Sequence, residues 1–406
     1  MGSGCTLTQS THSTQLSEKK LSMLHCQKHL FSIPEDIAYL NCAYMSPLLK
    51  SVEHVGVEGV RMKSRPYEIE VHHFFEPLQQ LKEAFAQLIN AGEAGRIAII
   101  PSVSYGTAIV ARNLALKPGG NIVLVEEQFP SNFYSWQRLA EERGAELRIV
   151  AAPSEMPRSP IWNERILAAI DERTALVTLG HVHWADGTRF DLKAIRQRAA
   201  SVGAWLVVDG TQSVGALPFD VQELQPDALI CAGYKWLLGP YSIGLAYFGP
   251  AFDNGIPIEE NWVNRLHSEN FKGLVDYQPL YRPLAGRYSM GEQSNFILVP
   301  MQLSALQQLL AWGVPNIQAY CRELMREPLR QLTGLGCQVE PEDHRAHHLV
   351  GVRLPEGADL DELKTAFQQK GVYVSLRGSA VRIACHLFND EQDMERLVKC
   401  FEQVLI

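Results

Sequence analysis

No stretch of this 406-residue sequence approaches the roughly 18–20 consecutive apolar residues that a membrane-spanning helix needs. The N-terminus, MGSGCTLTQSTHSTQLSEKK, is polar and lacks the apolar core of a secretory signal. The cysteines form no CxxC pair, and a chain of this size can bury a hydrophobic core without disulfides. We therefore expect reduced thiols and a cytoplasmic protein.

An excess of positive charge is also missing. The chain carries 37 Lys and Arg against 45 Asp and Glu, a formal net charge of −8. Nucleic acids and anionic lipid surfaces attract broad cationic faces, which an acidic chain of this kind does not provide. The histidine clusters at 72–73 and 344–348 lack a ligand spacing with cysteines or carboxylates. The sequence thus predicts no nucleic-acid partner, no membrane partner and no metal.

Residues 1–36 form a polar N-terminal extension. Gly2 followed by Thr6 fits the N-myristoylation pattern, and Cys5 could in principle carry a second lipid. That pattern is permissive, so we favour the alternative of an unstructured terminal tail.

Apolar β-branched runs alternate with amphipathic stretches over much of the chain. Runs without polar alternation predict strands buried on both faces, and strands interleaved with helices predict an α/β fold with a mostly parallel sheet flanked by helices. Ligands of such sheets bind outside the carboxyl ends of the strands. The runs lie at 97–102, 121–127, 146–152, 175–182, 204–210, 228–233 and 243–249.

The pattern changes after Pro250, where a loop-rich, aromatic stretch precedes long helical segments. Short strand-like runs and helices then alternate to the C-terminus. We predict a large domain over residues 37–290, whose N-terminal segment contacts the smaller domain. Residues 291–406 are predicted to form a smaller C-terminal α+β domain of usual size.

Two residues at predicted strand ends suggest chemistry. Asp209 ends the strand AWLVVDG, and Lys235 follows the next strand in AGYKWLLGP, so both could face one crevice. A lysine desolvated there could form a Schiff base with a carbonyl, and the carboxylate could keep a pyridine nitrogen protonated. Taken alone, such residues are weak evidence, because an aspartate at a strand end is more often a helix cap and a loop lysine is usually solvated.

The stretches DGTQSVGALPFDV, AGYKWLLGP and VRIACHLFND resemble the cofactor-binding core of the class V aminotransferase family, and the resemblance extends from about Tyr39 to the C-terminus. That family comprises fold-type I pyridoxal-phosphate (PLP) enzymes, including cysteine desulfurases, kynureninase and isopenicillin N epimerase-like proteins. The resemblance implies a fold-type I large domain with a mostly parallel seven-stranded sheet and pyridoxal 5'-phosphate as the cofactor. It also implies a homodimer, because the family's active sites lie at a dimer interface.

By the same resemblance, Lys235 would hold PLP covalently and later shuttle the proton. Asp209 would pair with the pyridine nitrogen, and Gln212 would reach the ring oxygen. Tyr234 stands where kynureninase-like members place a tyrosine on the phosphate, whereas many other members have histidine there.

Two further segments match parts of the family that contact the cofactor. The segment 97–116 reads strand, turn, helix, and a helix N-terminus is an anion site that Ser104 could also cap. The family match makes Val103 and Ser104 phosphate donors, the former through its backbone. Phe129 falls where many relatives stack a histidine on the ring, and a phenylalanine can stack there but cannot exchange a proton. A plain core residue is the alternative for Phe129.

The family also implies substrate contacts. Arg382 aligns with the arginine that binds the substrate carboxylate, and its planar fork suits a bidentate contact. Arg377 and His386 are possible neighbours. Trp184 replaces the usual asparagine or serine near the ring oxygen, so either it or His183 is expected to line the pocket.

A loop of the family that touches the partner subunit's phosphate aligns with residues 287–296. Glu292 stands there in place of a threonine, and a carboxylate beside a phosphate would be repelled. We therefore expect Gly291 or Ser294 to donate instead.

The reaction is less well specified than the cofactor. The segment VSLRGSAVR has no cysteine before Arg382, which disfavours a desulfurase, and the DGTQSVG core departs from that of kynureninase. An aminotransferase acting on an amino acid and a keto acid leads on family breadth, with a C–S β-lyase as the alternative. A catalytically silent binding homologue is a further alternative, but the presence of Lys235, Asp209 and Gln212 together with the arginine argues against it.

Overall fold

The computed structural model describes residues 24–378 and 380–406. Gly2, Cys5 and Thr6, on which the lipidation pattern depends, lie outside the described residues. No helix in the described part of the chain is both long enough and apolar enough to cross a membrane.

A seven-stranded sheet forms the centre of the large domain, in the order β2-β8-β7-β6-β5-β3-β4. All neighbouring strands are parallel except that β8 runs antiparallel to both β2 and β7. The predicted mostly parallel sheet is therefore confirmed. The strands are β2 (Ile97–Ile100), β3 (Asn121–Val125), β4 (Glu146–Val150), β5 (Thr174–Gly180), β6 (Trp205–Asp209), β7 (Ala228–Ala232) and β8 (Gly244–Phe248).

Most strands of this sheet bury both faces, which explains their lack of polar alternation. In β3, Ile122 and Leu124 point into one hydrophobic core, whereas Val123 and Val125 point into the other. The first core includes side chains of α3 (Val103–Asn113) and α4 (Tyr134–Arg143). The second includes side chains of α5 (Arg158–Ala169), α6 (Leu192–Ser201) and the short α7 (Val221–Leu224).

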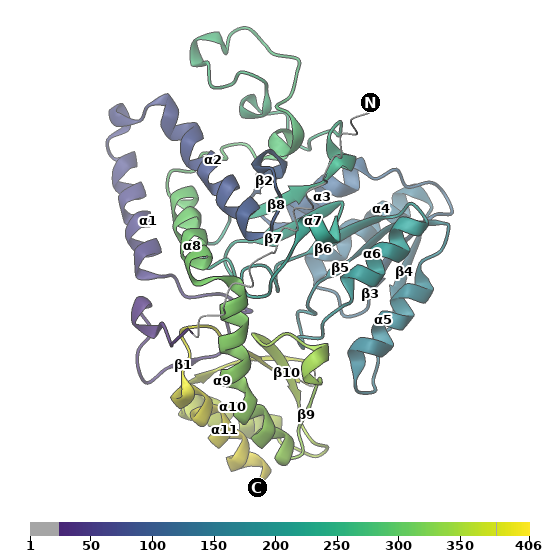
Figure 1. Ribbon diagram of the computed structural model, residues 1–406, viewed down its shortest axis with the longest axis vertical. Helices are drawn as coiled ribbons and strands as arrows, with labels where there is room; N and C mark the ends of the chain where they lie inside the picture. The colour runs from purple at the N-terminus through teal and green to yellow at the C-terminus, as the bar shows by residue number, and fades with distance from the viewer. Residues whose placement is uncertain (1–23, 379) are drawn as a thin grey trace, which may run out of the picture.

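Three further helices stand beside the β2 edge of the sheet (Figure 1). They are α1 (Lys50–Lys63), α2 (Val71–Leu88) and α8 (Leu298–Trp312), and α8 packs against both of the others. Helix α9 (Val314–Gly334) follows α8 directly and leads into the smaller domain.

The smaller domain has a four-stranded antiparallel sheet in the order β12-β13-β10-β9. Its strands are β9 (Gln338–Val339), β10 (Leu349–Arg353), β12 (Ser375–Arg377) and β13 (Ala380–Ala384). Helix α11 (Glu391–Leu405) packs against both α9 and α10 (Leu360–Gln369) in this domain. Near the N-terminus, β1 (Ala38–Tyr39) pairs in parallel with β11 (Val372–Tyr373), so the N-terminal segment lies against the smaller domain.

Candidate active site

Lys235 and Asp209 lie at the same edge of the large sheet. Asp209 is the last residue of β6, and Lys235 lies in the turn after β7, the parallel neighbour of β6. The hydroxyl of Thr211 accepts a hydrogen bond from the Ala232 amide at 3.1 Å, which ties the two strand ends together. The carboxyl ends of parallel strands meet at one edge, and this places the Lys235 amine and the Asp209 carboxyl within electrostatic reach of each other. Asp209 lines a small cavity there together with Gln212, Phe129 and Trp184.

Burial sets the electrostatics of this pair. Lys235 is only 7% exposed, and burial lowers the pKa of its amine to about 8, although the charge of Asp209 opposes the shift. Burial raises the pKa of the Asp209 carboxyl, while hydrogen bonds from Thr211 and the charge of Lys235 act in the other direction. A lysine amine with such a pKa is partly uncharged near neutral pH and can attack a carbonyl carbon.

Aromatic rings form one wall beside the lysine. The Lys235 Nζ lies 5.4 Å from the centre of the Phe129 ring, and Phe129 meets the Trp184 ring edge to face at 5.4 Å. The indole N–H of Trp184 donates to the Glu127 carbonyl at 2.7 Å. Trp184 therefore offers a flat apolar surface rather than the side-chain hydrogen bond that an asparagine would supply.

The N-terminus of α3 provides an anion-binding geometry. Ser102 caps the helix, because its hydroxyl accepts from the Tyr105 amide at 3.2 Å and lies 2.9 Å from the Ser104 hydroxyl. The first amides of a helix have no acceptor within the helix, so those of Val103 and Ser104 are available to an anion. Ser102 and Ser104 are exposed, which leaves this end of α3 open to a ligand.

Gln212 and Tyr234 are two further predicted cofactor-binding residues, and their side chains differ in how many hydrogen bonds they already make. The Gln212 amide donates to the Ala43 carbonyl at 3.0 Å and accepts from the Trp236 indole at 2.8 Å, so one amide hydrogen is left. The Tyr234 ring lies 5.5 Å from Lys235 Nζ and packs against Tyr241. Burial raises the pKa of the Tyr234 hydroxyl, which keeps it a hydrogen-bond donor.

Arg382 reaches this pocket from β13 of the smaller domain. It is 1% exposed, and its guanidinium donates to the Trp184 carbonyl at 2.8 Å and to the Ser375 hydroxyl at 3.4 Å. Its Nε has no hydrogen-bond partner in the described part of the chain. Burial, together with the charge of Arg377, lowers the Arg382 pKa to about 9. A buried guanidinium with an unused donor fits a carboxylate ligand.

The two predicted histidines, His183 and His386, are both buried, and of the two only His183 lines the small cavity beside Asp209. His183 hydrogen-bonds to the Asp186 carboxylate at 2.9 Å and packs against Trp162, so it belongs to a buried ion network. His386 packs among aromatic rings, including Trp236, and neither of its ring nitrogens has a partner among the described residues. Burial lowers the pKa of His386 to about 3, which keeps the ring uncharged.

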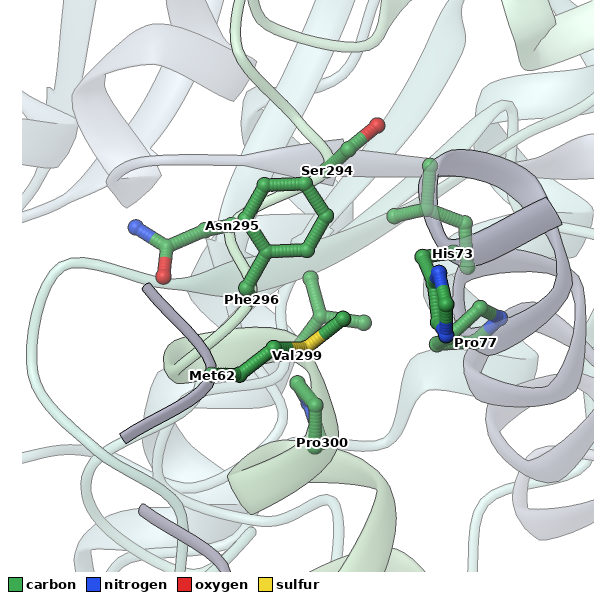
Figure 2. A pocket seen from close by; sticks show the side chains of 9 residues that line it. Met62, His73, Pro77, Ser294, Asn295, Phe296, Val299 and Pro300 are labelled. Atoms are coloured by element: carbon green, nitrogen blue, oxygen red, sulfur yellow. The ribbon is translucent and has the colours of Figure 1, made fainter. Parts of the chain in front are cut away.

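The donors expected near residues 287–296 are engaged within this chain. The Gly291 amide donates to the Glu259 carboxylate, and the Ser294 hydroxyl donates to the Phe74 carbonyl at 2.7 Å. Figure 2 shows this hydroxyl directed away from the neighbouring apolar pocket, which lies between α1, α2 and α8. That pocket contains none of the residues around Lys235.

The loop after β1 was missed in the sequence. The Cys42 thiol lies within electrostatic reach of Lys235, the Ala43 carbonyl holds Gln212, and the Ser46 amide donates to the Tyr234 carbonyl at 3.0 Å. The Tyr39 hydroxyl donates to the Met45 carbonyl and so ties the end of this loop to β1. No local motif marks the segment, because its position depends on the pairing of β1 with β11.

Within the described residues, no group of three or more His, Cys, Asp or Glu side chains could hold a metal ion. The groups around Lys235 are an amine, a carboxyl, an aromatic wall, a helix N-terminus and a buried guanidinium. This set suits an aromatic, phosphorylated aldehyde and an organic carboxylate better than a cation.

The chain resembles known proteins along most of its length. The family model of class V aminotransferases matches residues 64–397. A "probable cysteine desulfurase" of Methanothermobacter thermautotrophicus is 37% identical over 346 residues, covering 80% of this chain and 83% of that protein. An uncharacterized aminotransferase of Schizosaccharomyces pombe is 26% identical over 382 residues, with 91% and 92% coverage.

Solved structures share the fold. The cystine C–S lyase C-DES, in complex with its reaction product cysteine persulfide, has a TM-score of 0.82 at 19% identity, covering 91% of this chain and 98% of that chain. A mutant of C-DES holds glycine covalently linked to its PLP cofactor. The fold class is thereby confirmed, and the chain belongs to the class V aminotransferase family of PLP-dependent enzymes.

Proposed function

We propose that this protein is an aminotransferase that acts on an amino acid through its α-amino and α-carboxylate groups. One observation carries the proposal. The buried Lys235 amine, with a pKa lowered to about 8, lies within electrostatic reach of the Asp209 carboxyl and of Arg382, whose Nε has no partner among the described residues. An amine, a partner for a pyridine nitrogen and a carboxylate receptor are the three parts that such a reaction needs.

The residues present fit PLP. We assign covalent attachment to Lys235, the pyridine nitrogen to Asp209 and the phosphate to the α3 N-terminus at Val103 and Ser104. Phe129 would cover one face of the ring, while Tyr234 would donate to the phosphate and Gln212, with its remaining amide hydrogen, to the ring oxygen. Bound PLP withdraws electrons from the substrate's Cα and so makes its proton acidic.

Proton transfer then rests on Lys235. The groups that act electrostatically on its amine are Asp209, Arg382, Arg377 and Cys42. The Arg382 guanidinium, with a pKa of about 9, is charged near neutral pH, and burial raises the pKa of the Cys42 thiol well above its usual value. A single amine could carry the proton from the substrate's Cα to the cofactor carbon, and water would then release the keto acid by hydrolysing the carbon–nitrogen bond, which completes amino transfer.

The small-domain hairpin argues against a desulfurase. Only residues 378 and 379 separate β12 from β13, so no loop bears a cysteine ahead of Arg382. Among the described cysteines, Cys26 is half-buried and the others are buried. A sulfur-abstracting cysteine must be a thiolate with access to the substrate, and buried thiols do not meet this requirement.

We further propose that the active protein is a homodimer, as the family resemblance implies. The stretch 256–283 projects from the large domain (Figure 1) and exposes Val275, Tyr277 and Leu280. Light scattering on the purified holoenzyme should give twice the chain mass of 45.4 kDa. A monomeric mass for the active enzyme would contradict this proposal.

A single-turnover experiment tests the reaction type. Purified holoenzyme is mixed with single amino acids in the absence of a keto acid, and cofactor absorbance, keto acid and ammonia are measured. An aminotransferase changes absorbance once and releases one keto acid per site without ammonia. Ammonia and keto acid that accumulate over many turnovers would instead show a lyase. Lys235→Ala should show neither behaviour, and wild-type-like turnover in that variant would refute the assigned site.

A further inference from the structure

Arg377 is a second guanidinium, besides Arg382, within electrostatic reach of Lys235. Ser375 pairs directly with Arg382 in the β12–β13 ladder, so their side chains share one face of the small sheet. Arg377, two residues after Ser375, points to the same face. Its guanidinium lies 5.5 Å from the centre of the Trp184 ring, and the carbonyl of that tryptophan holds Arg382. Both arginines therefore meet at one residue.

The Arg377 guanidinium makes fewer hydrogen bonds within the described chain than its donors allow. Its Nη1 donates to the Leu376 carbonyl at 2.8 Å, and its buried Nε has no partner in the part of the chain that the structure describes. No ion pair joins Arg377 or Arg382 to a described carboxylate. A half-buried guanidinium without an acceptor loses solvation that is not replaced, and a bound anion would restore it.

The positive charge around Lys235 also favours a second anionic group on the substrate. Arg377 and Arg382 both lower the Lys235 pKa, and Arg377 also lowers the Arg382 pKa, so the three cations influence one another through a shared environment. Asp209 is the carboxylate that opposes them at Lys235. One substrate α-carboxylate on Arg382 would leave the charge of Arg377 uncompensated.

Resting on the proposed function, we propose that Arg377 binds a carboxylate on the substrate's side chain, so that the amino donor is an acidic, dicarboxylic amino acid. The α-carboxylate occupies Arg382, and the side chain extends along the Trp184 ring to Arg377. An arginine presents its fork in one plane, which matches a carboxylate, and stacking on the indole keeps that fork oriented. Neutral and basic side chains would leave the fork unpaired or repel it.

Matched donors test the inference. Values of kcat/KM are measured for L-glutamate against L-glutamine and for L-aspartate against L-asparagine, in wild type and Arg377→Gln. The wild type should prefer the acidic member of each pair. Arg377→Gln should lower kcat/KM for the acidic donors by about 10- to 100-fold and change it for the neutral donors by less than about threefold. Arg377→Lys keeps the positive charge but not the planar fork, so its kcat/KM for the acidic donors should lie between those of wild type and Arg377→Gln.

A binding measurement separates this inference from the reaction type. Calorimetry on the holoenzyme compares glutarate with pentanoate, which has the same number of carbons and one carboxylate fewer. Tighter binding of glutarate that disappears in Arg377→Gln supports the inference even if the enzyme proves to be a lyase. Equal binding of the two acids, or equal losses for acidic and neutral donors, would overturn it while leaving the aminotransferase proposal intact. Arg330→Gln, which removes an exposed guanidinium on α9, should leave all of these values unchanged.

Discussion

At the scale of single residues, two buried lysines share a property but differ in surroundings. Burial lowers the pKa to about 8 for both Lys235 and Lys82. Lys235 faces a carboxyl and lines the site, whereas Lys82 lies on α2 and is influenced by Arg282. A lowered lysine pKa is therefore not by itself a mark of reactivity. Position at the strand ends distinguishes the two.

The pH dependence of PLP capture follows from the Lys235 pKa. The free amine attacks the aldehyde, so the capture rate of cofactor-free protein should rise with pH through a midpoint near 8, well below the ordinary lysine value of 10.5. Stopped-flow absorbance measures this rate. Asp209 raises the Lys235 pKa, so Asp209→Asn should move the midpoint lower. Lys82→Met should leave it in place, and a wild-type midpoint near 10 would contradict the burial argument.

Cys42 provides a second test at this scale. Its thiol lies close enough to influence Lys235, but it is fully buried and its pKa is raised. We expect Cys42→Ala to retain turnover within about threefold, since the proposed reaction needs no thiolate. Loss of activity by a hundredfold or more in a folded, PLP-loaded variant would assign the thiol a chemical role. Cys400→Ala, a buried cysteine on α11, serves as the packing control.

The positions of Asp209 and Lys235 at predicted strand ends indicated that the two share one crevice, whereas only the family resemblance placed Phe129 and Arg382 beside them. The hydrogen bonds of Gln212 and Ser294 could not be foreseen. Their partners, Ala43 and Phe74, lie far away in the sequence, and no local pattern specifies such pairings.

At the scale of elements, close packing of α3 on β7 sets the position of the anion site. A Cβ added at Gly106 would lie 2.8 Å from Ile230 Cγ2, which is nearer than real contacts allow. Gly106 thus lets the start of α3 approach the strand that leads to Lys235. The sequence predicted the strand-turn-helix unit from its apolar run, but not the closeness of the two elements.

Replacing this glycine should separate the helix from the sheet. We expect Gly106→Ala to lower the free energy of unfolding by about 1–3 kcal/mol and to weaken PLP binding, because the Val103 and Ser104 amides would shift. Urea unfolding and PLP titration measure the two effects. Gly334 ends α9 with nothing within 4 Å of an added Cβ, so Gly334→Ala should be neutral or stabilise by up to about 1 kcal/mol. If Gly106→Ala and Gly334→Ala change the unfolding free energy and PLP binding equally, then the close contact between α3 and β7 does not set the position of the anion site.

Most of the sheet strands were predictable as elements because burial on both faces removes polar residues from them, whereas the edge strand β4 is partly exposed and keeps Glu146 and Arg148. The short β1 carries too few residues for any periodicity. Its pairing with β11 nevertheless brings the Asn41–Ser46 loop, including Cys42 and Ala43, to the candidate site. Elements defined only by long-range pairing are the ones that sequence patterns miss.

At the scale of the whole molecule, buried charges join the two domains. Glu340, from the smaller domain, accepts hydrogen bonds from the Arg158 and Ser159 amides at 3.0 and 2.7 Å and so caps α5 of the large domain. Arg158 in turn pairs with the buried Asp186. Asp186 lies two residues after Trp184, whose carbonyl holds Arg382. The same contacts that join the domains thus support the wall of the candidate site.

Removing the Glu340 carboxylate tests this coupling. Glu340→Ala leaves two buried amides without an acceptor, so we expect the free energy of unfolding to fall by about 2–3 kcal/mol. Glu340→Gln keeps one acceptor oxygen and should lose less. Glu342, two residues along, pairs with Arg322 at the surface, and Glu342→Ala should cost less than about 1 kcal/mol.

Because the cap is continuous with the Asp186 network and Trp184, Glu340→Ala should also raise KM for the amino acid, whereas Glu342→Ala should not. Urea unfolding that matches wild type in Glu340→Ala would show that this carboxylate contributes nothing to the stability of the contact between the domains.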